Sequence, residues 1–288
     1  MKTILTILSC LLLLCNSALA EYVPPKLTKN IGEQTKFMNY FAPAFDYDTD
    51  GCYPSVLIGS NNKVNEGLKL GGDRNGHCRD HQDLRDSNTN ARIACYTTNQ
   101  TELHCALLYA LYMQKDQVSH GGGSAGHRHD IEHAVVYTHC TSVCNKINNH
   151  EVSHVGHSAH GDLYVKPLSE HPLEEGDDIV GTHPRLVYHR AGVNTHSLRI
   201  AGFDEDAENH DGSWHFPTLV TWSEMEGDGS TTNDVLKGTL NNVDLGRAMV
   251  AFKDGRFLGS INNFRPSSEY NEFTESDRDY VPAIDWEE

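Results

Sequence analysis

The chain lacks a long hydrophobic run outside its first 20 residues. No later stretch reaches the roughly 20 apolar residues that a membrane-spanning helix needs, so no transmembrane segment is expected. Residues 1–20 combine one cation, Lys2, with a short apolar run and small residues up to Ala20. This is the pattern of a secretory signal peptide cleaved after Ala20. We therefore expect a secreted, extracellular protein.

Cations are also scarce. The chain has 23 Lys and Arg against 40 Asp and Glu, a formal net charge of −17. Such a chain repels nucleic acid and the anionic face of a bilayer. We expect no nucleic-acid partner, and any membrane partner must be recognised through a specific headgroup, for example across a bridging cation.

No pair of cysteines has the C-x-x-C spacing, which argues against a zinc ribbon. Six cysteines follow the signal peptide, and an even number in an exported chain is typical of three disulfides, for which fifteen pairings exist. Sequential pairing closes short loops at little entropic cost. We therefore predict the pairs Cys52–Cys78, Cys95–Cys105 and Cys140–Cys144.

Serine-nucleophile and phosphate-loop motifs are missing, and one modification motif is present. Asn99, Gln100 and Thr101 form an N-glycosylation sequon, which is usable if the source is eukaryotic and the site is exposed. Asn99 is therefore a candidate glycosylation site.

Short β-branched and aromatic runs dominate the rest of the chain and favour one mainly β domain with a few helices. Residues 21–40 are expected to be a loosely packed lead-in, residues 41–265 the domain, and residues 266–288 an acidic, mobile tail. A short helix is expected within 231–243. The apolar run 105–113 is either a buried strand or a buried helix. Strands are predicted within the ranges 127–139, 184–192, 198–203, 215–222 and 247–253.

The segment "HEVSHVGHSAH" (150–160) contains H-E-x-x-H, the zinc-protease signature. In this alternative, His150, His154 and His160 bind zinc and Glu151 activates a water. The motif works only on a helix, and the Asn, Ser, Val and Gly residues here are poor helix formers without an apolar stripe. His157 also stands where a metzincin has its turn glycine. A solvated, histidine-rich surface loop is the simpler interpretation.

The stretch "GHRHDIE" (126–132) offers a better metal site. In an extended segment Asp130 and Glu132 point to the same face. His127 has the opposite parity but lies beside a Gly-rich loop and can turn toward them, and the same loop can fold Asp116 back. Carboxylates with one imidazole suit a hard divalent cation, magnesium or calcium, with manganese as a further candidate. The alternative is a polar strand end with solvated charges.

"GHRHDIE" resembles the heptapeptide G-H-R-H-D-W-E of the necrosis- and ethylene-inducing peptide-like proteins, the secreted cytolysins of plant-associated microbes. Further similar stretches follow in the order of that family and cover residues 40–265. They are "FDYDTDGCYP" (45–54), "HCRD" (77–80), "ARIACYT" (91–97), "CALLYALYMQKDQ" (105–117), "HPRLVYHRAGVNTHSLRIA" (183–201) and "LGRAMVAFKDGRF" (245–257).

The resemblance implies a single β-sandwich flanked by a few helices, similar to actinoporins and fungal lectins. It implies a divalent cation held by His127, Asp130, Glu132 and Asp116. It also implies a monomeric, non-enzymatic toxin in the host apoplast, which binds glycosylinositol phosphoryl ceramide headgroups of the plant plasma membrane and damages that membrane. His196 and His127 are the implied headgroup contacts.

Three departures from the family pattern stand out. Ile131 replaces the tryptophan of the heptapeptide, and the region 191–193 lacks a tryptophan that the family often carries before the histidine matched by His196. Residues 140–156 resemble added length before "SAHGDLY" (158–164). On this interpretation His150 and His154 lie in an extra loop closed by Cys140 and Cys144, and the protease motif is fortuitous. A non-cytotoxic member that the host senses as a microbial pattern is a further alternative.

Overall fold

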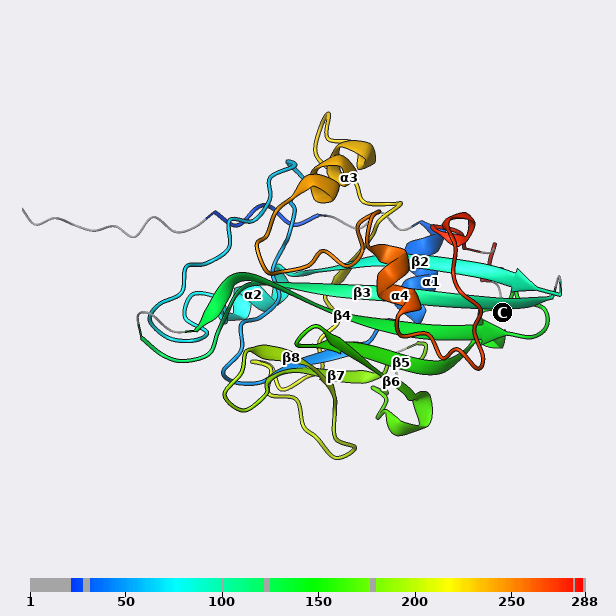
Figure 1. The fold of residues 1–288 in the computed structure, drawn as a ribbon, viewed down its shortest axis with the longest axis horizontal. Coiled ribbons are helices and arrows are strands. Elements are labelled where there is room, and N and C mark those ends of the chain that lie inside the picture. Colours follow the sequence, from blue (N-terminus) through cyan, green and yellow to red (C-terminus); the bar gives the residue numbers. More distant parts are fainter. Residues whose placement is uncertain are drawn as a thin grey trace, which may run out of the picture.

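Two β-sheets form the frame of the molecule in this computed structural model (Figure 1). The structure describes residues 22–27, 32–99, 101–121, 125–176, 180–281 and 283–286. The predicted signal peptide, 1–20, lies outside the described residues. The larger sheet has six strands, which in spatial order are β6 (Asp162–Pro167), β5 (Glu151–Ala159), β4 (Gly126–Cys140), β3 (Glu102–Gln117), β2 (Asn88–Thr98) and β9 (Thr218–Thr221).

The smaller sheet has three strands and lies on one face of the larger one (Figure 1). Its strands, in spatial order, are β1 (Ala44–Tyr47), β7 (Arg185–Arg190) and β8 (His196–Ile200). The helices are α1 (Glu33–Tyr40), α2 (His81–Arg85), α3 (Asn233–Asn242) and α4 (Phe257–Asn262), with single 3₁₀ turns η1 (Ile147–Asn149), η2 (Leu168–Glu170) and η3 (Glu275–Asp277). The predicted mainly β sandwich with a few helices is confirmed.

The central strand β3 is buried on both faces. Leu108 and Tyr112 pack with α3 and α4 on one side, whereas Leu111 and Met113 pack with β1, β7 and β8 on the other. A strand covered on both sides needs apolar residues at consecutive positions, which explains the unbroken apolar run 105–113. The structure therefore decides between the two alternatives for this run in favour of a strand.

Residues 32–40 of the N-terminal lead-in are well packed, contrary to the expectation. Helix α1 spans Glu33–Tyr40 within it, and the side chains of Phe37, Met38 and Phe41 are fully buried. Their spacing of one, three and four residues places them on one helical face, against β2 and β3. Helix α1 is only eight residues long and follows a proline-containing stretch, so the sequence did not indicate a packed helix here.

The C-terminal tail is also packed, and its predicted mobility is wrong for the described residues. Tyr270 and Phe273 are 3% and 1% exposed, in the cluster that contains α3 and α4. Asp279 accepts hydrogen bonds from the buried guanidinium of Arg92 at 3.0 and 2.8 Å. The acidic composition of this segment predicts mobility, but Tyr270, Phe273 and Asp279 anchor it to the sandwich.

The remaining strand predictions are mostly confirmed, with one error. Strands β4, β7, β8 and β9 lie within or overlap their predicted ranges, and α3 lies within 231–243. Residues 247–253 form turns and irregular structure instead of a strand, although Val250, Ala251 and Phe252 are buried. An apolar run indicates burial, but it does not establish pairing with another strand.

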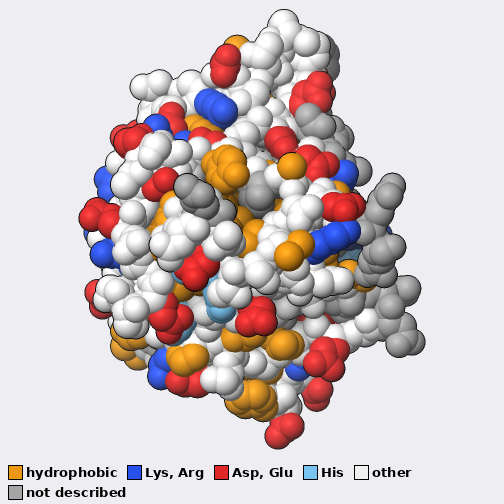
Figure 2. Space-filling view, turned by 90° about the vertical axis from the view of Figure 1, so that its right-hand side faces the viewer, with side chains coloured by type: hydrophobic (Ala, Val, Ile, Leu, Met, Phe, Trp, Pro, Cys, Tyr) orange, Lys and Arg blue, Asp and Glu red, His pale blue; other side chains and the backbone are white. Residues whose placement is uncertain are grey.

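All three predicted disulfides are present: Cys52–Cys78, Cys95–Cys105 and Cys140–Cys144. Cys95 and Cys105 lie directly opposite each other in the β2–β3 hairpin. Within the described residues, no helix combines the length and the apolar character needed to cross a membrane. Seen from the right-hand side of Figure 1, the surface carries more acidic than basic side chains (Figure 2).

Candidate functional site

The candidate site lies where strand β4 runs past the end of its ladder with β5. The pairing between these strands begins at Ala134 and His157, so residues 126–133 of β4 lie beyond it. Asp130 and Glu132 share the parity of Ala134, which packs toward β7 and β8, whereas Ile131 packs toward α4. Side chains from both faces of β4 can therefore reach one opening at this edge.

Three predicted ligands come together at this edge. Asp116, His127 and Asp130 each offer a ligand atom, and these atoms all lie within 4.8 Å of one another. Asp116 is brought there by β3 itself, since it pairs directly with His127 of β4, and not by a folded-back loop. His129, between His127 and Asp130, has a φ of 60°, which interrupts the alternation of the strand. This explains how residues of opposite parity meet.

A glycine at the start of β4 permits the close approach of Asp116. Gly126 has a φ of 137°, and a Cβ at this position would lie 2.2 Å from the backbone oxygen of Asp116. Any side chain would force the two strands apart at the level of the acidic group. The position therefore requires glycine.

Hydrogen bonds orient two of the possible ligands. The Nδ1 of His127 lies 2.7 Å from the backbone oxygen of His129, so it donates there and leaves Nε2 with its lone pair for a metal. The hydroxyl of Tyr188 donates to Oδ2 of Asp130 at 2.9 Å. Two carboxylates and an imidazole oriented in this way fit a hard divalent cation with further positions open to water or ligand.

His196 holds Asp116 in place. Its backbone N–H donates to Oδ2 of Asp116 at 2.8 Å, and its Nδ1 lies 2.7 Å from Oδ1. Nε2 lies 3.2 Å from a carboxylate oxygen of Asp50. Burial lowers the pKa of His196, but the hydrogen bond and charge of Asp116 and the charge of Asp50 outweigh it and raise the pKa. An imidazole between two carboxylates donates from both nitrogens, so it carries a positive charge.

The burial of His196 bears on its predicted role. The side chain is 3% exposed and stacks on Tyr188 with 5.0 Å between ring centroids. The geometry gives it a positioning role behind Asp116, and direct contact with a lipid headgroup stays a prediction.

Burial and like charge make it unfavourable for the carboxyl groups of Asp130 and Glu132 to be ionised without a bound cation. Burial, followed by the negative charge of Asp116, raises the pKa of Asp130 to about 7. Burial, followed by the charge of Asp130, also raises the pKa of Glu132 well above its ordinary value. A bound divalent cation removes this penalty because it stabilises the ionised carboxylates.

Glu132 lies outside the group of three. Its Oε2 accepts a hydrogen bond from the hydroxyl of Ser158, and this hydroxyl in turn accepts from the backbone N–H of His133 at 2.8 Å. Glu132 lines the same opening as Asp130, so its predicted role as a ligand stays a prediction.

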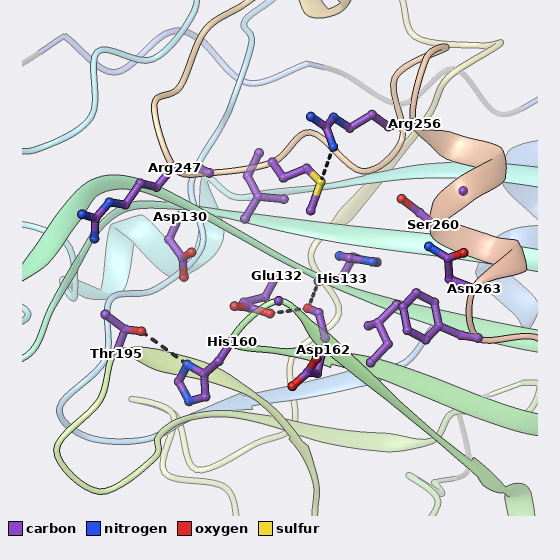
Figure 3. A pocket seen from close by; sticks show the side chains of 18 of the residues that line it. Asp130, Glu132, His133, His160, Asp162, Thr195, Arg247, Arg256, Ser260 and Asn263 are labelled. Carbon is purple, nitrogen blue, oxygen red and sulfur yellow. Dashed lines mark hydrogen bonds between the residues drawn. The ribbon is translucent and has the colours of Figure 1, made fainter.

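The acidic group opens into a cavity of about 590 Å³. Asp130, Glu132 and His127 line one part, and the turn 160–163 between β5 and β6 lines another (Figure 3). The opposite wall is formed by residues of the segment 247–264, which includes α4. A cavity of this size accommodates a small organic ligand such as a sugar.

The structure does not support the zinc-protease alternative. Residues Glu151–Ala159 form strand β5, so the H-E-x-x-H motif is extended and not helical. His150 is buried against Phe37 and lies 2.9 Å from the backbone oxygen of Cys144. His160 lies at the β5–β6 turn, where its Nδ1 is 3.4 Å from the hydroxyl of Thr195. The expectation of an extra loop is also wrong for His154, which lies in β5.

The predicted glycosylation site is accessible. Asn99 is exposed at the turn of the β2–β3 hairpin, with a φ of 50°. Its use stays a prediction.

The fold and the site together define a class of protein. It is a two-sheet β-sandwich in which a candidate cation-binding group lies beside a cavity large enough for a sugar. Residues 35–264 match the model of the family described as Necrosis inducing protein (NPP1). The chain belongs to this family, as its motifs predicted.

Relatives and solved structures agree with this assignment. NLP effector protein 10 of Phytophthora capsici is 26% identical over 217 residues, which are 75% of this chain and 77% of the relative. Necrosis-inducing protein NPP1 of Phytophthora nicotianae is 27% identical, with 75% and 76% covered. The non-toxic HaNLP3 protein has a similar fold, with a TM-score of 0.61 and 24% identity over 85% of this chain and 97% of that one. NLPPya in complex with mannosamine gives 0.60 and 24%, with 83% and 93% covered.

Several residues of the site were not found from the sequence. Tyr188 and Asp50 orient the predicted residues, whereas His133, Arg247 and Arg256 line the cavity. They come from distant parts of the chain. Asp50, Tyr188, Arg247 and Arg256 lie in stretches that resemble the family, but the pattern of those stretches does not mark them as site residues. Only the fold brings them together.

Proposed function

We propose that the chain is a secreted, non-enzymatic cytolysin that binds the glycosylinositol phosphoryl ceramide headgroup of plant plasma membranes and then damages the membrane. The observation that carries the proposal is the convergence of Asp116, His127 and Asp130 at the edge of a sugar-sized cavity. These residues would hold a divalent cation, magnesium or calcium. Such a cation supplies positive charge to a sugar hydroxyl without breaking a bond.

The relatives support this proposal. Members of the family are named necrosis-inducing proteins or effectors, and NLPPya has been solved in complex with mannosamine and with glucosamine. A cation also provides a local attractive point on a chain with a net charge of −17.

Dye release from vesicles tests the proposal. Vesicles that contain the plant glycolipid should leak in the presence of the protein and a divalent cation, whereas a chelator or Asp130→Asn should abolish leakage. Asp234→Asn is the matched control because it removes an exposed carboxylate on α3, away from the cavity. Equal leakage from vesicles without the glycolipid, or full activity of Asp130→Asn, contradicts the proposal.

A non-cytotoxic member is the second candidate. The similar fold of the non-toxic HaNLP3 protein favours it, as do two of the three departures from the family pattern, at Ile131 and at the loop that contains Val193. Val193 is 84% exposed at the tip of the β7–β8 loop. This candidate predicts cation-dependent binding to the same vesicles without leakage of the dye.

A further inference from the structure

The wall of the cavity that faces the acidic group is rich in hydrogen-bond donors. Arg247, Arg256, Ser260 and Asn263 all line it, and they lie on one side of β4 in Figure 3, with Glu132 and Asp162 on the other. Guanidinium groups are donors only, and their planar fork matches the oxygens of a phosphate or a carboxylate. This wall therefore favours anionic groups, whereas the candidate cation site favours a positively charged ion.

The two arginines have no internal counter-charge. Among the described residues, neither Arg247 nor Arg256 forms an ion pair, although the chain has 40 acidic residues. Arg256 instead directs one guanidinium nitrogen at the sulfur of Met249, 3.0 Å away, and Met249 lines the same cavity. Two unneutralised cations at one cavity of so acidic a protein leave this position open to an anion.

A buried and unsatisfied histidine gives independent support for a ligand at this position. His133 is 7% exposed and lines the cavity, and its Nε2 has no hydrogen-bond partner in the described structure. A buried polar atom without a partner is costly unless a ligand or water satisfies it. His133 has the parity of Ile131, so it faces the side of β4 on which α4 and the arginines lie.

We propose that Arg247, Arg256 and His133 form an anion subsite that binds a phosphate or carboxylate of the same ligand whose sugar lies at the cation. The inference rests on the proposed function, and it assigns an acidic group of the ligand to named residues of the cavity wall. The cavity of about 590 Å³ is large enough for one molecule to reach both walls.

Calorimetry with three probes tests the inference at fixed magnesium and ionic strength: mannose, mannose 6-phosphate and inorganic phosphate. The wild type should bind mannose 6-phosphate at least about tenfold more tightly than either other probe, because only this probe reaches both walls. Arg247→Gln combined with Arg256→Gln should remove the preference, so that this variant binds mannose 6-phosphate no more tightly than it binds mannose. Arg85→Gln combined with Lys166→Gln is the control, because it removes two exposed cations that do not line the cavity.

The outcomes separate this inference from the proposed function. Equal, magnesium-dependent affinities of the wild type for mannose and mannose 6-phosphate overturn the anion subsite and leave the cation site intact. Inorganic phosphate bound as tightly as mannose 6-phosphate overturns the claim that one ligand spans both walls. A preference for mannose 6-phosphate that needs the arginines but survives a chelator supports the subsite and contradicts the cation-dependent function.

The same variants identify the source of the anion. Loss of binding to vesicles with the plant glycolipid in the double arginine variant assigns the subsite to the lipid headgroup. Retained vesicle binding, together with a lost preference for mannose 6-phosphate, assigns it to a free sugar phosphate.

Discussion

At the scale of single residues, the candidate cation-binding group of Asp116, His127 and Asp130 depends on one close contact between strands β3 and β4. A Cβ on Gly126 would lie 2.2 Å from the backbone oxygen of Asp116, and backbone cannot move away as a flexible side chain can. We predict that Gly126→Ala weakens the binding of magnesium at least about tenfold, since it displaces Asp116 relative to His127. Isothermal titration with magnesium measures the change.

The control for this substitution is Gly212→Ala. Gly212 also has a positive φ, 69°, but a Cβ there would meet nothing within 4 Å. It therefore places an alanine at a positive φ without the clash, although the strain is smaller at 69° than at 137°. If both variants lose magnesium affinity equally, strain and not the contact with Asp116 is responsible.

The raised pKa of Asp130 predicts how stability depends on pH. Below about pH 4 the carboxyl is protonated in both the folded and the unfolded chain. As the pH rises toward 7, the unfolded chain loses this proton first, since the folded pKa is about 7, so the free energy of unfolding falls. Glu132, whose pKa is raised well above its ordinary value, acts in the same direction.

A divalent cation should reverse this loss, because it binds the ionised carboxylates. We predict that millimolar magnesium raises the Tm more at pH 8 than at pH 5. Thermal unfolding followed by circular dichroism measures it. Asp130→Asn should remove the magnesium effect at both pH values. An equal rise of the wild-type Tm at pH 5 and pH 8 would falsify the assignment of Asp130 as a ligand.

At the scale of elements, the tail following α4 is a structural part of the sandwich. Phe273 is 1% exposed and packs with Tyr270 and Tyr96. We predict that Phe273→Ala lowers the free energy of unfolding by about 3–5 kcal/mol, the usual cost of removing a buried Phe side chain. Tyr280→Ala, at a residue that is 48% exposed, should change it by less than about 1 kcal/mol. Urea unfolding that does not distinguish the two variants contradicts a packed tail.

Some elements and site residues can be predicted from the sequence, and others cannot. Strand β4 and the candidate ligands Asp116, His127 and Asp130 follow from local pattern and motif, because their chemistry is encoded within a few residues. The run 105–113 is compatible with a buried strand or a buried helix, and only the fold identifies it as part of β3. The left-handed φ of His129, which brings His127 and Asp130 together, has no signal in composition. Arg247 lies in a segment expected to be a strand, residues 247–253, and Arg256 follows it directly before α4. Both reach the cavity because that segment turns before α4.

At the scale of the whole molecule, net charge and local charge act in opposite directions. The chain carries a net charge of −17, so at long range it is repelled by an anionic membrane. The attractive points in our proposals, a divalent cation held at Asp130 and the guanidinium groups of Arg247 and Arg256, belong to one cavity. Under these proposals, recognition of an anionic ligand requires close approach, which would select a specific headgroup over general surface charge.

The opposite effects of net charge and local charge predict how the rate of dye release depends on salt. When phosphatidylserine replaces phosphatidylcholine at constant plant glycolipid, the rate of dye release should fall at low salt, because the membrane then repels the protein before the headgroup is reached. The difference should shrink with added salt, since the screening length falls from about 30 Å at 0.01 M to about 8 Å at 0.15 M. The double variant at Arg247 and Arg256 should show the same trend from a lower starting rate. Faster release from the phosphatidylserine vesicles at low salt would mean that a general electrostatic attraction, and not the cavity, brings the protein to the membrane.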